Sequence, residues 1–515
     1  MDRRDSMSFA TRVSRLLVPA ERLVAALTDP ARRERTAAAV LIAYAAVWSL
    51  YGAIAKSSQD LHFDMGEAVS WSRELSLGYP KHPPLSAWLV RAWFSVFPSA
   101  DWSYYLFAII LASLGLWIAW KLSEYYIEGE KRVVGLALLT LVPFFNFHAL
   151  KFNANTVLIP VWAATTWWFL RSYETRRIGY AALAGLAAAA AMLGKYWSIL
   201  LLAGLAIAAL AGPCRKAYFR SAAPWVTVAV GSLAMAPHLV WLIGRDFGTF
   251  DYALISHATQ TRWDAAGWGV DYIVSTLAYI AVPILLVLVA ARLGKAALAD
   301  TLWPQDAARR TALLAFALPL LLPFVVAIAA KSQVVSLWAM SAMTLLPVVL
   351  LSSLRLSVPR AAAVHIVAIA LTLPVLATLL SPVIAFVIHQ RGVPNNATHY
   401  RLLAAEIEQT WRATTDRPLR FVGGNTALAY GAVFYLSDRP QAYTDDRDAP
   451  IVDPARVARA GIALACLAEE QDCIRNIETY AGAAGRRMEV ELVRSYFGVA
   501  GQPARYLIVT VPPQP

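Results

Sequence analysis

Long apolar runs recur along most of this chain and are separated by short polar segments. A helix needs about 20 mainly apolar residues to cross the hydrocarbon of a bilayer. About eleven runs approach that length, at residues 37–55, 103–120, 133–150, 155–170, 178–194, 196–212, 224–243, 272–291, 311–330, 334–352 and 361–388. The pattern therefore predicts a mainly α-helical polytopic membrane domain over residues 36–389.

The pattern changes after residue 389, because the long apolar runs stop. Short apolar segments bounded by polar ones predict strands, and amphipathic stretches predict helices. The expected strands are 419–423, 462–467 and 505–511, and the expected helices are 400–411 and 472–481. Residues 390–515 are therefore predicted to form a small soluble α/β domain.

The first 35 residues combine eight arginines with regularly placed apolar side chains. Such a segment is typical of an amphipathic helix on an anionic membrane surface. The apolar run that follows is too long for the core of a signal peptide, and no clear cleavage site comes after it. We expect residues 1–35 to lie in the cytoplasm and the run to be the first span.

The segment between the first two spans, residues 56–100, is the most polar part of the first hundred residues. It contains Asp64 and Glu67, three residues apart, and then Lys81 and His82 directly before two prolines. Residues 83–97 place apolar side chains at helical spacing, which predicts a helix lying flat on the membrane.

Composition supports the membrane assignment, since 58% of the residues are hydrophobic, 16% are charged and the mean hydropathy is +0.50. A soluble protein this apolar would expose aggregating patches. The net charge of +12 is interpreted as membrane topology and not as nucleic-acid binding. Basic residues recur in alternate loops, at 121–132, 171–177, 215–220, 292–310 and 355–360.

Cytoplasmic loops of membrane proteins carry an excess of lysine and arginine, so these loops are predicted to face the cytoplasm. The chain is then expected in a bacterial inner membrane, with the N-terminus cytoplasmic and the C-terminal domain periplasmic. Cys466 and Cys473 fall in that outer domain, where a disulfide is possible. Cys214 falls on the reducing side and is predicted to be unpaired.

This topology gathers the polar groups of many segments at the outer face. The candidates are Asp64, Glu67, Lys81, His82, Lys151, Asn153, Asn155, Lys195, His238 and Lys331. A carboxylate can deprotonate an acceptor, and cations can bind a phosphate or the charge on a departing phosphate. Structural interpretations are also open: an ordinary solvated loop for the charges of residues 60–84, snorkelling anchors for Lys195 and Lys331, helix caps for Asn153 and Asn155, and a hydrogen-bonded helix end for His238.

The segment LGYPKHPPL, residues 77–85, resembles part of the first outer loop of bacterial GT-C glycosyltransferases, in the protein O-mannosyltransferase-like and aminoarabinose-transferase-like group. The similarity continues through ALKFNANTVL (149–158), AAMLGKYWSILLL (190–202), APHLVWL (236–242) and SLWAM (336–340). It covers most of the chain in short motifs.

The resemblance implies an inverting transfer of a sugar from a polyprenyl-phosphate carrier to an envelope acceptor, which is a lipid, a glycan or a protein. It matches the family's catalytic acid to Asp64. Relatives often carry two adjacent acids, whereas Met65 follows Asp64 here and the second carboxylate is Glu67, so Asp64 is expected to be the base and Glu67 to support it, with the reverse assignment open. Donor phosphate binding is expected from Lys81, His82, Lys151, Lys195 and Lys331, and acceptor or sugar binding from Asn153, Asn155 and His238. No cofactor is expected, and a divalent metal stays open.

A transporter or flippase of a lipid-linked or anionic solute is the alternative. It predicts charged groups near the bilayer midplane, broken helices and an internal repeat. The sequence contains no evident repeat, and its charges gather at one face. A receptor or assembly factor acting through the outer domain would leave that gathering unexplained.

Overall fold

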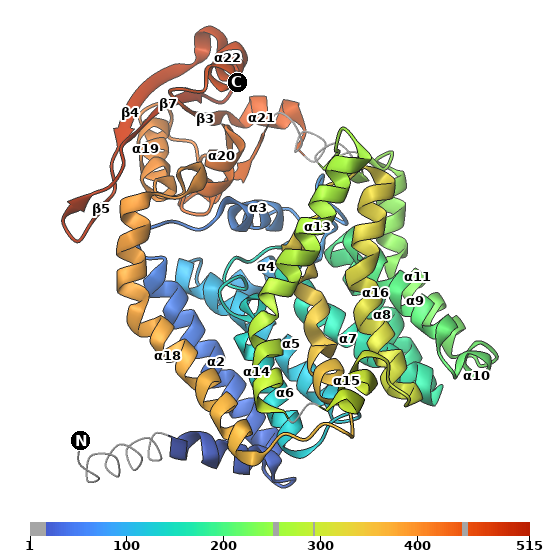
Figure 1. The fold of residues 1–515 in the computed structure, drawn as a ribbon. Coiled ribbons are helices and arrows are strands. Elements are labelled where there is room, and N and C mark those ends of the chain that lie inside the picture. The colour runs from blue at the N-terminus through green and yellow to red at the C-terminus, as the bar shows by residue number, and fades with distance from the viewer. Residues whose placement is uncertain (1–16, 251–256, 292–293, 445–451, 515) are drawn as a thin grey trace, which may run out of the picture.

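The computed structural model describes residues 17–250, 257–291, 294–444 and 452–514. Residues 1–16 of the predicted amphipathic segment lie outside the described residues, and residues 17–28 are helical as expected. Figure 1 shows a helical bundle with the C-terminal domain at one end. The N-terminal helix and α15 (Lys295–Leu302) lie at the opposite end.

Five described helices are long and apolar enough to cross a membrane. They are α2 (Arg33–Ala55), α5 (Asp101–Ser123), α11 (Ala223–Ile243), α16 (Ala307–Ala330) and α18 (Arg360–Arg391). A sixth candidate is a pair bent by 47°, α13 (Arg262–Tyr279) and α14 (Ala281–Ala290). The chain is therefore a multi-pass membrane protein.

The remaining predicted spans do not form helices that are both long and apolar enough to be membrane-crossing candidates within the described residues. They correspond to α6 (Gly129–Leu141) with η1 (Pro143–Phe145), α7 (Ala154–Thr175), α8 (Ile178–Gly194), η2 (Tyr196–Ser198), α9 (Ile199–Ala211), α10 (Arg215–Phe219), and η3 (Ser336–Leu345) with α17 (Leu346–Leu351). The segment predicted at 334–352 is mostly a 3₁₀ helix, so an apolar run of the right length does not always form a continuous α-helix. The count of eleven spans is not confirmed.

The segment between α2 and α5 contains more structure than the sequence indicated. It forms α3 (Phe63–Ser72) and α4 (Leu85–Phe94). The second matches the predicted flat helix, whereas α3 was not predicted. It lies between the bundle and the C-terminal domain (Figure 1).

The C-terminal domain is a five-stranded sheet in the order β2-β1-β3-β7-β4. Its elements are η4 (Pro394–Asn396), α19 (Tyr400–Arg412), β1 (Phe421–Gly424), α20 (Thr426–Val433), β2 (Gln441–Ala442), α21 (Pro454–Ala460), β3 (Ile462–Leu467), α22 (Gln471–Ala481), η5 (Gly482–Ala484), β4 (Arg486–Leu492) and β7 (Ala504–Val511), with a separate hairpin of β5 (Ser495–Tyr496) and β6 (Val499–Ala500). Strands β2, β1 and β3 are parallel, and β7 runs antiparallel to both β3 and β4.

Successive residues of β3 face opposite sides of the sheet, as the period of a strand requires. Ala463 and Ala465 pack in one cluster with α19 and α20, while Leu464 and Cys466 pack in another with α22. Both faces of the sheet are thus covered by helices, and the α/β prediction holds. Cys466 and Cys473 form a disulfide and Cys214 is free.

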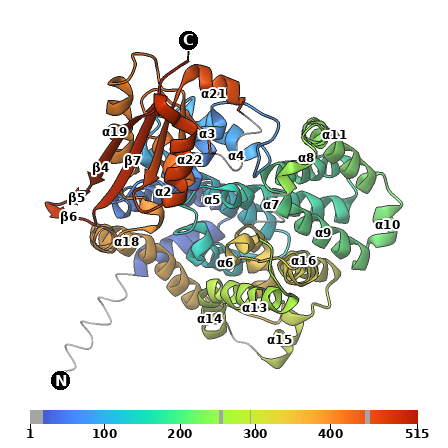
Figure 2. The same ribbon diagram turned by 90° about the horizontal axis from the view of Figure 1, so that it is seen from above.

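The C-terminal domain packs directly against α3 and the residues that precede it. Gly66 of α3 lies so close to α20 that a β-carbon there would overlap the carbonyl oxygen of Tyr430. Asp60, whose side chain is fully buried, accepts from Arg494 at 3.0 Å and from the backbone N–H of Arg401 at 3.0 Å. Seen from above, the domain covers α2, α3 and α5 and leaves α9 to α11 uncovered (Figure 2).

Candidate functional site

Helix α3 presents both predicted carboxylates on one face. His62 caps its start, because Nδ1 of that ring accepts from the backbone N–H of Asp64 at 3.2 Å. Asp64 and Glu67 are three residues apart, so their side chains are neighbours on the helix surface. The predicted pair is therefore brought together by a helix that covers the end of the bundle next to the C-terminal domain.

Asp64 is an ionised carboxylate in an ion pair. Nζ of Lys151 lies 2.8 Å from Oδ2 of Asp64, and Nδ1 of His62 lies 3.7 Å from Oδ1. Burial alone would raise the pKa of Asp64, but the charges of Lys151 and Lys81 outweigh that effect and lower it. The side chain is 21% exposed, so an incoming molecule can reach it.

Glu67 is more deeply placed and is paired with a different lysine. Nζ of Lys81 lies 3.1 Å and 3.2 Å from its two carboxylate oxygens, and the Glu67 side chain is 8% exposed. Each carboxylate of α3 thus has its own cation, one from the loop before α7 and one from the loop before α4.

His82 lies beside Lys81 with its ring edge against Trp71, at a centroid distance of 6.0 Å. Burial, together with the charges of Lys81 and Lys195, holds the pKa of His82 well below its ordinary value. The ring is therefore neutral at pH 7 in the ligand-free chain. It was expected among cations that bind phosphate, and here it can only offer a neutral hydrogen bond.

Lys195 projects from the tight turn between α8 and α9. Its Nζ donates to Oδ1 of Asn155 at 3.0 Å and lies 4.5 Å from the ring centroid of Trp338. Burial, followed by the charge of Lys81, lowers the pKa of Lys195 to about 7. Asp64 is also near enough to influence this ammonium, so Lys81, Lys195 and Asp64 share one polar site.

Three predicted residues take other positions. Asn153 caps α7, with its Oδ1 accepting from the N–H groups of Asn155 at 2.9 Å and Thr156 at 3.3 Å. His238 bridges the carbonyl of Leu77 at 2.6 Å and the hydroxyl of Tyr196 at 2.9 Å. Lys331 is exposed at the left-handed C-cap of α16, and no ion pair within the described ranges includes it.

Lys56 and His62 contribute to the site and were not predicted. Both line a cavity of about 140 Å³ with Asp60, Lys151, Val393, Pro394 and Ala397. Burial lowers the pKa of His62 to about 4, and burial and the charge of Lys151 lower the pKa of Lys56. A single lysine after a membrane span carries no sequence signal, whereas the proximity of His62 to the expected acid could have drawn attention.

Asp64 therefore lies in a basic environment. Its carboxylate pairs with Lys151, which borders the cavity together with Lys56, and the charges of Lys81 and Lys195 also act at this site. A separate apolar cavity of about 450 Å³ runs between α7, α8, α9 and α11. Its lining includes Met192, three residues before Lys195, and Leu239, which follows His238.

Comparisons with known proteins agree on the fold. Residues 81–241 match the family described as dolichyl-phosphate-mannose-protein mannosyltransferase. ArnT from Cupriavidus metallidurans bound to undecaprenyl phosphate has a TM-score of 0.61 at 13% identity, covering 92% of this chain and 97% of ArnT. The chain therefore has the GT-C fold that this ArnT has. The apo form of that ArnT gives a TM-score of 0.60 at 11% identity, over 93% of this chain and 99% of the other.

A curated protein similar to part of this chain is the lipid A galacturonosyltransferase RgtD from Rhizobium johnstonii, which is 27% identical over 190 residues. The match spans 36% of this chain and 39% of the relative. The GT-C resemblance stated from the sequence motifs is thereby confirmed. Lys81, His82, Lys151 and Lys195 lie inside the matched family region, whereas Asp64 and Glu67 precede it.

Proposed function

We propose that this chain transfers a sugar from a polyprenyl-phosphate carrier to an envelope acceptor, at the periplasmic face of a bacterial inner membrane. The observation that carries the proposal is the Asp64 carboxylate, which pairs with Lys151 and lies among several lysines at one end of the bundle. This orientation places the N-terminus in the cytoplasm and the C-terminal domain in the periplasm. It follows the excess of basic residues in the loops at the opposite end.

In the proposed reaction, Asp64 accepts the proton of an acceptor hydroxyl as that oxygen attacks the anomeric carbon of the donor sugar. The bond between the anomeric carbon and the phosphate oxygen breaks, and the phosphate leaves with the electron pair. A single displacement inverts the anomeric centre. A base held next to the reacting hydroxyl accelerates such a step by about 10²- to 10⁴-fold.

Lys81 and Lys195 are assigned to the departing phosphate. Fixed cations in a water-poor site stabilise developing charge more than they would in water. Glu67 has a supporting role, because it holds the ammonium of Lys81 at 3.1 Å. Lysines supply the neutralising charge in this scheme, and metal dependence is left to experiment.

The proposal that the donor has a polyprenyl carrier is supported by the apolar cavity between α7, α8, α9 and α11. One end of it lies near Lys195 and His238 in the chain, so a hydrocarbon tail there would place its phosphate near Lys195. The ArnT of similar fold binds undecaprenyl phosphate, a carrier of this class.

The acceptor is proposed to be a phosphorylated glycolipid of the lipid A class. The curated relative acts on lipid A. The cavity beside Asp64 supports an anionic group, since Lys56 and Lys151 border it and Asp60 is already matched by Arg494 and Arg401. A phosphate bound there would bring a nearby hydroxyl toward Asp64.

The test uses the full chain in liposomes with undecaprenyl-phosphate galacturonic acid or aminoarabinose as donor and lipid A as acceptor. Mass spectrometry should detect sugar-modified lipid A and equimolar free undecaprenyl phosphate. Parallel transfer assays with EDTA measure whether turnover depends on a divalent metal. Movement of the intact donor to the other leaflet without a covalent product would replace this proposal with the flippase alternative.

A further inference from the structure

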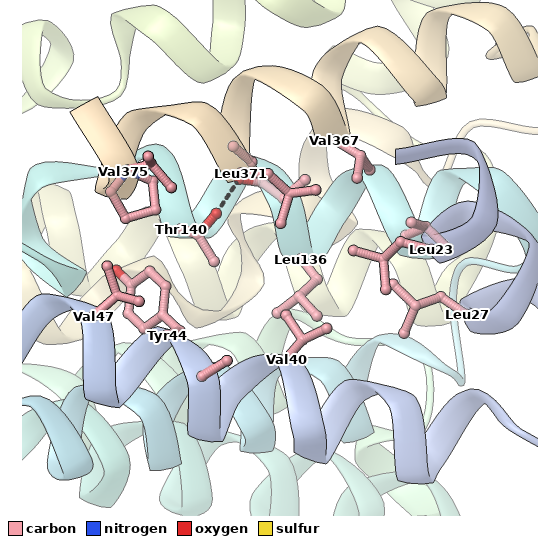
Figure 3. A pocket seen from close by; sticks show the side chains of 15 residues that line it. Leu23, Leu27, Val40, Tyr44, Val47, Leu136, Thr140, Val367, Leu371 and Val375 are labelled. Carbon is pink, nitrogen blue, oxygen red and sulfur yellow. Dashed lines mark hydrogen bonds between the residues drawn. The ribbon is translucent and has the colours of Figure 1, made fainter. Parts of the chain in front are cut away.

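A second apolar cavity lies at the other end of the bundle, far from Asp64 in the fold. It has a volume of about 210 Å³ and is walled by α2, α6, α18 and the helix of residues 17–28. Figure 3 shows Val40 and Tyr44, Leu136 and Thr140, and Val367 and Leu371 pointing into it from the three bundle helices. Leu23 and Leu27 close one end.

This second cavity is called the groove below. Both hydroxyl groups in its lining already have hydrogen-bond acceptors, so neither needs a partner from a ligand. The hydroxyl of Tyr44 donates to the carbonyl of Phe145 at 2.9 Å, and that of Thr140 donates to the carbonyl of Ala137 at 2.7 Å. Cavities of about 150 Å³ lined by aliphatic and aromatic side chains stay dry and bind apolar molecules. The groove is thus suited to hydrocarbon and not to water or a sugar.

The groove has the length expected for a chain from one leaflet. Its lining extends from Val40 to Val47 along α2, which is about 10 Å at 1.5 Å per residue. On α18 it extends from Val367 to Val375, about 12 Å by the same rise. One leaflet contributes about half of the roughly 30 Å hydrocarbon core.

Arginines and acidic residues alternate in the segments around the end that Leu23 and Leu27 close: Glu21 is exposed beside Arg22, and Asp29 and Glu34 pair with neighbouring arginines. Arg22 precedes Leu23, and Arg32 and Arg35 lie around the start of α2, and all three side chains are exposed. Arg32 pairs with Asp29 at 3.5 Å, and within the described ranges the ion pairs include neither Arg22 nor Arg35. Arg22 and Arg35 are therefore the candidates for binding an anionic headgroup at this end.

We infer that this groove binds one acyl chain of an anionic phospholipid, from the leaflet in which the N-terminal helix lies, with the phosphate held by Arg22 and Arg35. The bound chain packs between α2 and α18 and fixes the helix of residues 17–28 against the bundle. This lipid is neither donor nor acceptor in the proposed reaction. The inference therefore does not depend on the proposed function.

The test is native mass spectrometry of the purified full-length protein after a delipidating wash, titrated with palmitoyl-oleoyl phosphatidylglycerol or with phosphatidylcholine of the same chains. Ala43→Phe and Ala370→Phe fill the groove from opposite walls. Ala46→Phe adds the same ring at an exposed position of α2 outside the lining. Melting temperatures of all variants establish that they are folded.

We expect one tightly held phosphatidylglycerol in the wild type and in Ala46→Phe, bound about tenfold more weakly, or about 1.4 kcal/mol, in both groove-filling variants. Arg22→Gln with Arg35→Gln should reduce the preference for phosphatidylglycerol over phosphatidylcholine and leave chain binding intact. Equal retention in the folded groove-filling variants and the wild type would overturn the site. Equal affinity of wild type for the two lipids would overturn the headgroup assignment.

Discussion

The two ends of the bundle are both rich in charge, but they use it differently. At the end near α15, half-buried carboxylates are paired with cations, and the excess of basic residues is exposed to solvent: Glu34 pairs with Lys121 at 3.3 Å and Arg132 at 3.4 Å, and Asp300 pairs with Arg309 at 2.9 Å. At the end under the C-terminal domain, Lys56, Lys151, Lys81 and Lys195 surround Asp64 and Glu67.

Matched pairs between helices satisfy each other's charge and hydrogen bonds, which is a structural role. An excess of half-buried cations has the opposite effect, because each ammonium loses water without a full set of partners. The lowered pKa values of Lys56 and Lys195 express this cost. The comparison teaches that unbalanced charge, more than charge itself, marks where an anion is expected.

The largest expected effect is on Asp64. Asp64→Asn should lower turnover by about 10²- to 10⁴-fold, because the amide cannot accept the proton of the acceptor. Its melting temperature should stay close to that of the wild type. The measurement is transfer from undecaprenyl-phosphate sugar in liposomes.

Glu67→Gln is the matched comparison, since it changes the other carboxylate of α3. It should lower turnover less, through the position of Lys81. Normal turnover in Asp64→Asn together with loss in Glu67→Gln would move the base role to Glu67. Normal turnover in both would remove this site from the reaction.

Next in size is the loss of a donor-binding cation. Lys195→Gln should raise the KM for the donor by about 10- to 100-fold, because a hydrogen bond to a charged group contributes about 1.5–3 kcal/mol. Lys331→Gln is the control, since that side chain is exposed at a helix end. Equal effects of the two changes would contradict the assignment of Lys195.

The end of the bundle near α15 provides a test in which stability should change and activity should not. Asp300→Asn should destabilise the chain by about 1–3 kcal/mol, because Asp300 accepts from Arg309 at 2.9 Å and from the hydroxyl of Ser353 at 2.6 Å. The folded protein should retain its kcat. A large fall in kcat with unchanged thermal stability would break the distinction between the two ends.

The smallest expected effect is a pH dependence through Lys195. Its pKa in the fold is about 7, below the ordinary value of 10.5, so above pH 7 the unfolded chain binds more protons than the fold. The free energy of unfolding without donor should therefore rise by about 1 kcal/mol between pH 7 and 9. This value is lower than the full shift would give, because solvent near the ammonium screens its charge. Lys195→Met should lack this component of the pH profile.

Donor affinity should change in the other direction over the same range. It should fall as pH rises through 7, because the ammonium that binds phosphate loses its proton. A donor KM that does not change between pH 6 and 8 would argue that Lys195 lies away from the phosphate.

The sequence by itself determined the class of the protein and much of its architecture. Apolar runs near 20 residues place α2, α5, α11, α16 and α18, because a helix in hydrocarbon must satisfy its own backbone. The short apolar segments after residue 389 place β1, β3 and β7. The motif around Lys81 identified the GT-C resemblance, which the comparisons confirm.

Only the tertiary structure decided which polar residues meet. Asp64 and Lys151 are 87 residues apart, and their 2.8 Å ion pair depends on how α3 lies over the loop before α7. Asn153 and Asn155 look alike in the sequence, yet the first caps α7 and the second accepts from Lys195. Periodicity records which side chains avoid water, and that constraint is local. The pairing of charges depends on distances between elements, and those are set when the bundle and the C-terminal domain pack around α3.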